Sequence, residues 1–379
     1  MTTRTGTKVT GLALAAMAVA GILAAGCEQS VTTYGDPQFR PKLFQNLPDE
    51  FCQPDGQRLD PKTNEMYVAF PNFTVPRHPG VLGKITTDNR LVKVCDMPKH
   101  PETGVAGPMG LDIGPDGNLY VADNQYFANK DHKSRVIRVV MEDGKAVRTE
   151  VAAEGFKLAN AVMFKGNDMY VTDTFFDRKD RPGTSGVYRI GLDEMKKGTV
   201  RLLTKDQYEK DPHCIASWQT IPHPHRKGEL SGADGMTFDA DGNCYVGDFG
   251  DGVMRKITFN ADGAVKSCDV FVKNFGRMTC CDGIFYDKIR NCIYVADSER
   301  NAIQVVWLPD GQLTTLWENG DTNGADGLLD QPCEPNMRGD ELILSNFDMP
   351  FPGLRNTKFD RPYTMSVIDV SKLQRPAKP

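Results

Sequence analysis

Short apolar runs separated by polar turns recur along the chain from about residue 40 onward. The clearest unit, SGADGMTFDADGNCYVGDFGDG, runs from Ser231 to Gly252. Its apolar residues form one run around Met236 and a second over Cys244–Val246, and Asp241-Gly242 between them has the composition of a tight turn. Apolar runs of this length that are bounded by turn residues are typical of β-strands. The unit therefore predicts two strands joined by a turn.

The same unit occurs six times, and a repeat with a period of about 50 residues is typical of a β-propeller or a solenoid. After each copy come further strand-like runs, as in Val253–Thr258 and Val265–Val272 on either side of Asp262-Gly263. Four strands per copy make one blade, so the chain predicts an all-β, six-bladed β-propeller with four-stranded antiparallel blades. The other copies are DGQRLDPKTNEMYVAF (55–70), MGLDIGPDGNLYVADN (109–124), NAVMFKGNDMYVTDT (160–174), DGIFYDKIRNCIYVADS (282–298) and the more divergent CEPNMRGDELILSNF (333–347).

The last copy is one strand short, because after Glu341–Ser345 only Tyr363–Val370 has the pattern of a strand. The segment Pro41–Asn46, which precedes the first copy, can supply the missing outer strand. We therefore expect the N-terminal segment to close the last blade, which leaves no free sheet edge there. The propeller is then placed at residues 39–372 and a short C-terminal tail at 373–379.

The first 27 residues have the composition of an export signal. Arg4 and Lys8 precede the apolar run Gly11–Leu23, and Ala-Ala-Gly-Cys ends at Cys27. This stretch resembles a bacterial lipoprotein signal with its lipobox, although its leucine stands one position further from Cys27 than is usual. The resemblance implies lipidation of Cys27, a tether over residues 28–38 and a place in the bacterial cell envelope, facing the periplasm or the exterior. An ordinary secretory signal and an uncleaved anchor are the alternatives.

Charge and cysteine content narrow the possible partners. With 45 basic and 50 acidic residues and no basic stripe, the chain gives no reason to expect nucleic-acid binding. We expect a monomer that acts on a small-molecule substrate and meets the membrane through the lipid anchor only. Nine cysteines remain beside Cys27; export permits disulfides, but the pairing cannot be derived from the sequence.

The repeat alignment predicts which side chains meet at the central channel. The first strand of each blade lines the channel, so the residues that open these strands gather at one mouth. In the sixth copy either Cys333 or Asp326 can take this position, because Gly324–Gly327 resembles Gly232–Gly235. The six residues are Asp55, Met109, Asn160, Asp234, Asp282 and, in the preferred register, Cys333.

Three carboxylates and an amide at one narrow mouth predict a bound cation. Like charges this close raise one another's pKa values unless a cation neutralises them. Oxygen donors suit calcium or magnesium, and calcium tolerates irregular geometry better. The alternative is that Asp-Gly is a turn signal repeated by descent, but a turn does not explain Asn160 at the same point.

These repeats resemble the senescence marker protein/gluconolactonase (regucalcin-like) family, which is related to the paraoxonases and diisopropylfluorophosphatase. The resemblance implies a six-bladed propeller with a divalent cation, most readily Ca²⁺, held by Asp55, Asn160 and Asp234. Asp55 stands where the family has a glutamate. Met109 stands where many members have an asparagine that contacts substrate, which argues against sugar-lactone activity. The implied function is metal-dependent hydrolysis of a lactone or related ester, with Asp234 and Asp282 as candidate catalytic bases.

A second resemblance points to a different class of protein. Pro108-Met109-Gly110 and the repeated Tyr-Val-Ala-Asp also resemble NHL repeats, which often form non-catalytic binding propellers. This resemblance makes an envelope binding protein the alternative function.

Other residues can reach the same mouth. An insertion, Lys210–Leu230, carries His213, which we assign to substrate binding beside Met109. Five phenylalanines follow second strands closely and can either floor an apolar pocket or pack between blades. They are Phe127, Phe175, Phe176, Phe249 and Phe347.

Overall fold

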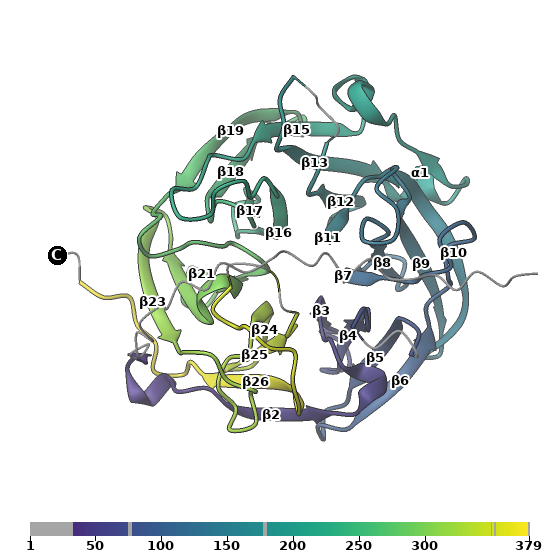
Figure 1. Cartoon of the computed structure of the whole chain (residues 1–379). Coiled ribbons are helices and arrows are strands. Elements are labelled where there is room, and N and C mark those ends of the chain that lie inside the picture. The colour runs from purple at the N-terminus through teal and green to yellow at the C-terminus, as the bar shows by residue number, and fades with distance from the viewer. Residues whose placement is uncertain (1–32, 75–77, 177–179, 350, 352–353, 378–379) are drawn as a thin grey trace, which may run out of the picture. The chain divides into compact units, whose positions relative to one another are not determined.

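The computed structural model describes residues 33–74, 78–176, 180–349, 351 and 354–377. Within these residues six sheets stand around a central axis as the blades of a propeller (Figure 1). The predicted fold class is therefore confirmed. The predicted signal segment 1–27, with its Cys27, and residues 28–32 of the predicted tether lie outside the described residues.

The first three blades follow one another in chain order, each starting with its innermost strand. Blade 1 consists of β3 (Gln57–Leu59), β4 (Met66–Phe70), β5 (Val81–Ile85) and β6 (Leu91–Asp96). Blade 2 consists of β7 (Pro108–Ile113), β8 (Leu119–Asp123), β9 (Ser134–Glu142) and β10 (Lys145–Phe156), with the short β14 (Val200–Arg201) added in parallel. Blade 3 consists of β11 (Ala159–Lys165), β12 (Asp168–Asp173), β13 (Thr184–Gly191) and β15 (Cys214–Gln219).

The other three blades complete the ring. Blade 4 consists of β16 (Ala233–Phe238), β17 (Cys244–Asp248), β18 (Met254–Phe259) and β19 (Val265–Val272). Blade 5 consists of β20 (Ile284–Asp287), β21 (Cys292–Asp297), β22 (Ala302–Trp307) and β23 (Gln312–Glu318). Blade 6 consists of β24 (Pro332–Arg338), β25 (Glu341–Asn346), β26 (Tyr363–Asp369) and β2 (Lys42–Leu47). The helices are α1 (Leu192–Met195) and the 3₁₀ turns Pro37–Phe39, Asp49–Phe51, Lys205–Lys210 and Ser298–Arg300.

The two ends of the described chain are fastened to the ring. β2 pairs antiparallel with β26, from Lys42 opposite Val367 to Leu47 opposite Tyr363, so the N-terminal segment closes the last blade as predicted. Upstream of it, β1 (Tyr34–Gly35) pairs with the outer strand of blade 5. Among the described residues, strand pairing with the ring thus begins at Tyr34, within the stretch predicted as a tether. In the predicted tail, the Arg375 side chain donates to the backbone oxygen of Leu308 at 3.0 Å.

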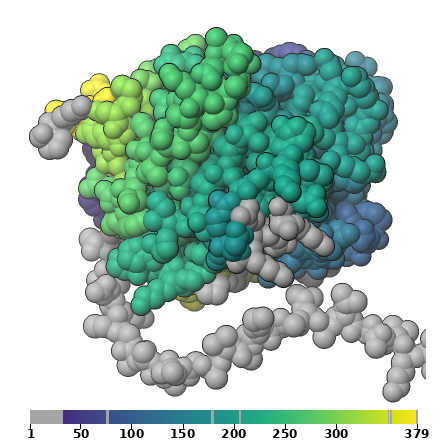
Figure 2. All heavy atoms as spheres, turned by 90° about the horizontal axis from the view of Figure 1, so that it is seen from above, coloured from purple at the N-terminus to yellow at the C-terminus, as the bar shows by residue number. Residues whose placement is uncertain are grey.

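The apolar core lies between the blades. Alternate residues of a strand face opposite sides of its sheet, and in β4 Met66, Val68 and Phe70 pack towards blade 6, while Tyr67 and Ala69 pack towards blade 2. Six such clusters fill the six blade interfaces. Figure 2 shows the ring from its edge, where the teal part of the chain lies directly beside the green part that follows it in the sequence.

The aspartate at the end of the second strand has a structural role in several blades. Asp123 accepts a hydrogen bond from the backbone N–H of Gly107 at 2.8 Å, and Asp173 accepts one from Leu158 at 2.8 Å. Each bond holds the chain just before it enters the innermost strand of a blade. In blade 4, Asp248 accepts the indole N–H of Trp218 at 2.8 Å.

Two further features of the described residues are the state of their cysteines and the length of their helices. All nine cysteines among the described residues are free thiols, and Cys280 and Cys281 are buried. No helix in the described part of the chain is long and apolar enough to cross a membrane.

The closing strand provides a test of the ring's construction. Leu47 is buried in the cluster between blades 6 and 1, whereas Leu43 on the same strand is 37% exposed. Leu47→Ala should lower the free energy of unfolding by about 2–5 kcal/mol, because it removes buried methyl groups and leaves a cavity. Leu43→Ala, the matched control, should change it much less. Equal effects of the two substitutions in denaturant unfolding would contradict this account of closure.

Candidate active site at the channel mouth

The six residues predicted at one mouth of the channel all line a single pocket of about 790 Å³. Asn160, Asp234 and Cys333 are the second residues of β11, β16 and β24, whereas Asp55 and Asp282 lie two residues before β3 and β20. Cys333 thus occupies the sixth position. Asp326, the other candidate, is half exposed and pairs with Arg40 at 2.9 Å.

In the first five copies the residue after this position is glycine or alanine, because neighbouring innermost strands nearly touch there. A Cβ on Gly56 would lie 2.5 Å from the Cα of Gly110, and one on Gly235 would lie 2.3 Å from the backbone oxygen of Asp282. Neither approach is possible for a real side chain. The Asp-Gly pairs that open the repeats, such as Asp55-Gly56 and Asp234-Gly235, are therefore points of close approach between blades, whereas Asp241-Gly242 is a turn.

Buried carboxylates form the floor of the pocket. Asp55 and Asp234 are 4% and 5% exposed. The Cys333 thiol donates to Asp55 Oδ1 at 3.5 Å and approaches Asp282 Oδ1 at 3.8 Å. The Ser298 hydroxyl lies 2.5 Å from Asp282 Oδ2. Asp55 Oδ2 is buried and has no hydrogen-bond donor among the described residues.

The pKa values of these groups are shifted upward. Burial, followed by the charge of Asp282, raises the pKa of Asp55 to about 8. Burial raises the pKa of Asp282 to about 6, and hydrogen bonds from Ser298 and its neighbours limit that rise. The pKa of Asp234 is raised by burial and then by the charges of Asp282 and Asp55. Without a cation, ionising these buried and neighbouring carboxyl groups costs free energy, because burial and like charges disfavour the charged form.

Glu334 lies close enough to this floor to interact with Asp55 and Asp282, although it does not line the pocket, and it was not predicted from the sequence. It follows Cys333 at the point where four other copies have glycine, and its carboxyl group lies against Gly283 of blade 5. Burial and the charges of Asp55 and Asp282 raise its pKa, which Arg58 partly opposes. The signal was present in the alignment, because a charged residue at a position otherwise held by glycine is an anomaly.

The donor set fits a divalent cation. Carboxylate oxygens and the amide of Asn160 are the hard donors that Ca²⁺ prefers, and the unpartnered Asp55 Oδ2 is an acceptor that such an ion would satisfy. The spacing is looser than in a closed ion site. Among the described residues, the three acidic groups whose oxygens lie within 4.8 Å of one another are Asp330, Asp348 and Asp360.

His213 lies elsewhere. It directly precedes β15, the outermost strand of blade 3, and is not among the residues that line the pocket. Its ring nitrogens contact Asp211 at 2.7 Å and Glu194 at 3.1 Å. The structure therefore corrects the expectation that this side chain reaches the mouth, whereas Met109 does line the pocket.

Aromatic side chains form the rim of the pocket. Phe127, Phe175, Phe249 and Phe347 line it, but Phe176 is buried in the core between blades 2 and 3. Two further rim residues were not predicted from the sequence. Tyr126 stacks on Phe175 with ring centroids 4.7 Å apart, and Phe351 lies 6.3 Å from both Phe127 and Phe249.

Part of the insertion lies over one side of the pocket. Residues 225–231 contribute to its lining. Arg226 holds this segment in place, since it pairs with Glu299 at 3.0 Å and lies 5.1 Å above the ring of Phe249. The pocket thus has a charged floor and a mainly aromatic rim.

Comparison with known proteins supports the fold. No protein-family model and no curated protein matches the chain. A gluconolactonase from Xanthomonas campestris superposes with a TM-score of 0.52 at 13% identity, covering 90% of this chain and 97% of that one. Regucalcin from Agrobacterium tumefaciens, a calcium-binding protein, gives 0.54 at 14%, with 87% and 93% covered. The PQQ-bound aldose sugar dehydrogenase of Streptomyces coelicolor gives 0.52 at 12%, with 88% and 98% covered. The shared property is the six-bladed propeller.

The close approach of the strands can be tested directly. Gly235→Ala should destabilise the protein by about 1–3 kcal/mol, because its Cβ must displace the backbone of the next blade. The exposed Gly276 is a matched control, since an added Cβ would meet nothing closer than 3.6 Å. Urea unfolding of the two variants checks the difference. A Gly235→Ala variant as stable as the Gly276→Ala variant would contradict the steric argument.

The shifted carboxyl groups predict a pH dependence of the cation-free protein. Folding raises the pKa of Asp55 from 3.8 to about 8, so the folded state binds more protons than the unfolded chain between these values. Stability is therefore lost as the pH rises through this window. In excess chelator the melting temperature should fall between about pH 5 and pH 8. Asp55→Asn should reduce that fall, whereas the exposed control Asp326→Asn should leave it unchanged; identical slopes for all three proteins would contradict the prediction.

Proposed function

We propose that this pocket is the active site of a divalent-cation-dependent hydrolase that acts on a lactone or related ester. The observation that carries the proposal is the convergence of Asp55, Asp234 and Asp282 on the channel axis, with one buried oxygen of Asp55 left unpartnered. Buried acidic groups with raised pKa values in a pocket are a recognised mark of functional sites.

Asp55, Asn160 and Asp234 would hold the cation, most readily Ca²⁺. When bound, such an ion polarises a carbonyl oxygen as a Lewis acid. Holding it also offsets the repulsion that, in addition to burial, raises the pKa of Asp234. These three side chains therefore serve both the folded state and the binding of an ester carbonyl.

Asp282 is the candidate general base. In the cation-free protein its pKa is about 6, so it is largely ionised near neutral pH and more basic than an exposed aspartate. The hydroxyl of Ser298, 2.5 Å from Oδ2, orients the carboxylate. Asp282 can thus take the proton of an attacking water and return it to the leaving alcohol. Asp234, the other candidate base, is better suited to cation binding because, besides being buried, it lies among the negative charges of Asp282, Asp55 and Glu334.

The rim favours a substrate with an apolar or aromatic substituent. Tyr126, Phe127, Phe175, Phe249 and Phe351 surround the entrance to the charged floor. Met109 adds a further apolar surface where a sugar hydroxyl would need a polar partner. The carbonyl end of a substrate would then point to the floor and its apolar part would contact the rim.

The structural neighbours are compatible with this proposal. One is a gluconolactonase and another a calcium-binding regucalcin. A third is a dehydrogenase on the same fold, so the proposal depends on the residues of the site rather than on the superposition.

Two substitutions separate the proposed roles. Asp234→Asn should abolish hydrolysis and weaken Ca²⁺ binding, because it removes a ligand charge. Asp282→Asn should keep the ion but lower kcat by about 10²-fold or more, as expected for a lost general base. Asp326→Asn, at an exposed site outside the pocket, is the control. Turnover would be measured on aliphatic, aromatic and sugar lactones and esters, with Ca²⁺ and with chelator, and ion binding by calorimetry.

The outcomes discriminate between the two classes of function. Full turnover by Asp234→Asn would refute the mechanism. If the wild-type protein hydrolyses no compound but binds one of them at the rim, the alternative of a non-catalytic binding propeller replaces the hydrolase.

A further inference from the structure

A second group of carboxylates lies in the loops of blade 6, away from the channel floor. Asp330 is in the connection from β23 to β24, Asp348 follows β25 and Asp360 precedes β26. One oxygen of each lies within 4.8 Å of the others. Asp348 and Asp360 mark the two ends of the loop between β25 and β26, so the group joins both ends of that loop to the preceding blade connection.

The group has more acceptors than donors. Asp348 Oδ1 accepts from the Asn356 amide at 2.9 Å, and Asp348 Oδ2 accepts from the backbone N–H of Asp360 at 3.1 Å. Among the described residues, no donor reaches Asp330 Oδ1, Asp360 Oδ1 or Asn356 Oδ1. Asp330 and Asn356 are each only 1% exposed, so water does not readily satisfy these oxygens. A buried acceptor without a donor is costly.

The surrounding charges add to the imbalance. Burial and the charges of Asp348, Asp360 and Asp321 raise the pKa of Asp330 to about 9. The neighbouring Arg361 points to Asp49, which it contacts at 2.7 Å. Three aspartates with one oxygen each within 4.8 Å of the others, two of which also keep a buried oxygen without a donor, match the donor set of a bound cation.

We propose that Asp330, Asp348 and Asp360 form a second divalent-cation site, independent of the channel mouth. Ca²⁺ is the expected ion, since it accepts several protein oxygens in irregular geometry, whereas Mg²⁺ retains much of its water. The ion would neutralise the buried carboxylates and fasten the two ends of the loop to blade 6.

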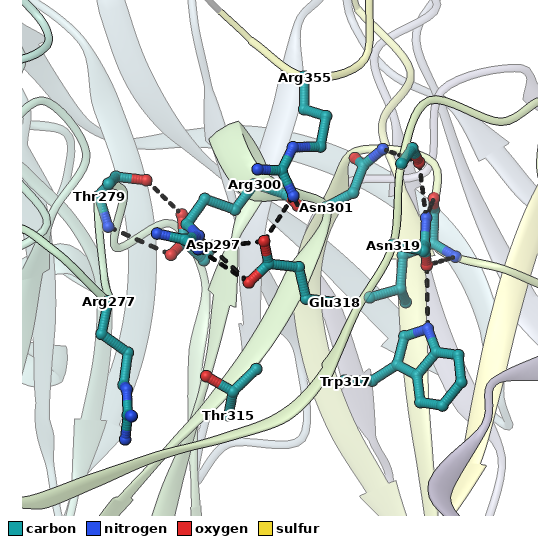
Figure 3. A network of polar contacts seen from close by, with 12 residues as sticks. Arg277, Thr279, Asp297, Arg300, Asn301, Thr315, Trp317, Glu318, Asn319 and Arg355 are labelled. Carbon is teal, nitrogen blue, oxygen red and sulfur yellow. Dashed lines mark hydrogen bonds and ion pairs between the residues drawn. The ribbon is translucent and has the colours of Figure 1, made fainter. Parts of the chain in front are cut away.

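The location gives this site a consequence for the pocket. Phe347 and Phe351, at the start of the same loop, contribute to the aromatic rim. Further along the loop, Arg355 is fixed separately, because its guanidinium donates to Glu318, which also binds Arg300 (Figure 3). Ion binding at the loop ends and this ion pair in its middle would together hold one wall of the rim.

Ion counting tests the proposal. After dialysis against Ca²⁺, bound calcium per chain would be measured by mass spectrometry for the wild-type protein, Asp330→Asn, Asp360→Asn and the control Asp326→Asn. The first two variants should bind one ion fewer than the wild type, and the control should bind the same number. Asp234→Asn, which alters the channel mouth, should lose a different ion, so that Asp234→Asn combined with Asp330→Asn loses both. Unchanged calcium in Asp330→Asn and Asp360→Asn would overturn the proposal, whatever Asp234→Asn shows.

In a second measurement the main comparison is made on the wild-type protein, so it does not depend on whether the variants fold. Lys358 is exposed within the loop and offers a site for trypsin. In the wild-type protein, Ca²⁺ should slow cleavage after Lys358 at least about tenfold relative to chelator, because opening of the loop then requires release of the ion. Asp234→Asn should retain this protection and Asp330→Asn should lose it. Equal cleavage rates with and without Ca²⁺ in the wild type would overturn the proposal.

Discussion

The close approach of neighbouring innermost strands is the constraint on which the mouth of this propeller depends. Where Gly56 meets Gly110 and Gly235 meets Asp282, the backbones of adjacent blades leave no room for a side chain. The residues just before these glycines cannot move apart without opening the ring. Their side chains are therefore forced into a small volume whatever their charge. The acidic floor is a result of strand packing, and its electrostatic cost must be met by protonation or by a cation.

The strands reach this arrangement because each is fixed where it enters the blade. Asp123 and Asp173 bind backbone N–H groups just before β7 and β11. These aspartates carry no site chemistry, although they recur in the repeat as regularly as the aspartates of the mouth. Two sets of acidic residues in one repeat thus have different roles, and they are distinguished by what surrounds them. The first set is satisfied by backbone donors, whereas Asp55 retains an oxygen without one.

The repeat explains why so much could be predicted from the sequence. The number of blades, the closing strand and the six residues at the mouth all follow from its period and its alternation. Features outside the repeat could not be placed in this way. His213 stands in an insertion, so no alignment could show that β15 would be the outermost strand. Phe175 lines the pocket, whereas its neighbour Phe176 packs in the core. The sequence could not show which of the two faces the pocket, because they lie where the strand ends and its alternation stops.

The loops of blade 6 show the same limit on prediction from the repeat. Asp330, Asp348 and Asp360 lie on segments without repeat character, and only the fold brings their oxygens together. The floor and the rim of the pocket differ in origin. The floor is built by repeated strands and is rigid, because any displacement must shift a neighbouring blade. The rim is built by unrelated loops, each of which needs its own anchor, such as Arg226 on Glu299 or Arg355 on Glu318. A cation at the base of the last loop would serve the same purpose. Under the proposed function, the residues of the repeat would then determine the reaction chemistry, and the anchors of the loops would determine which substrate is selected.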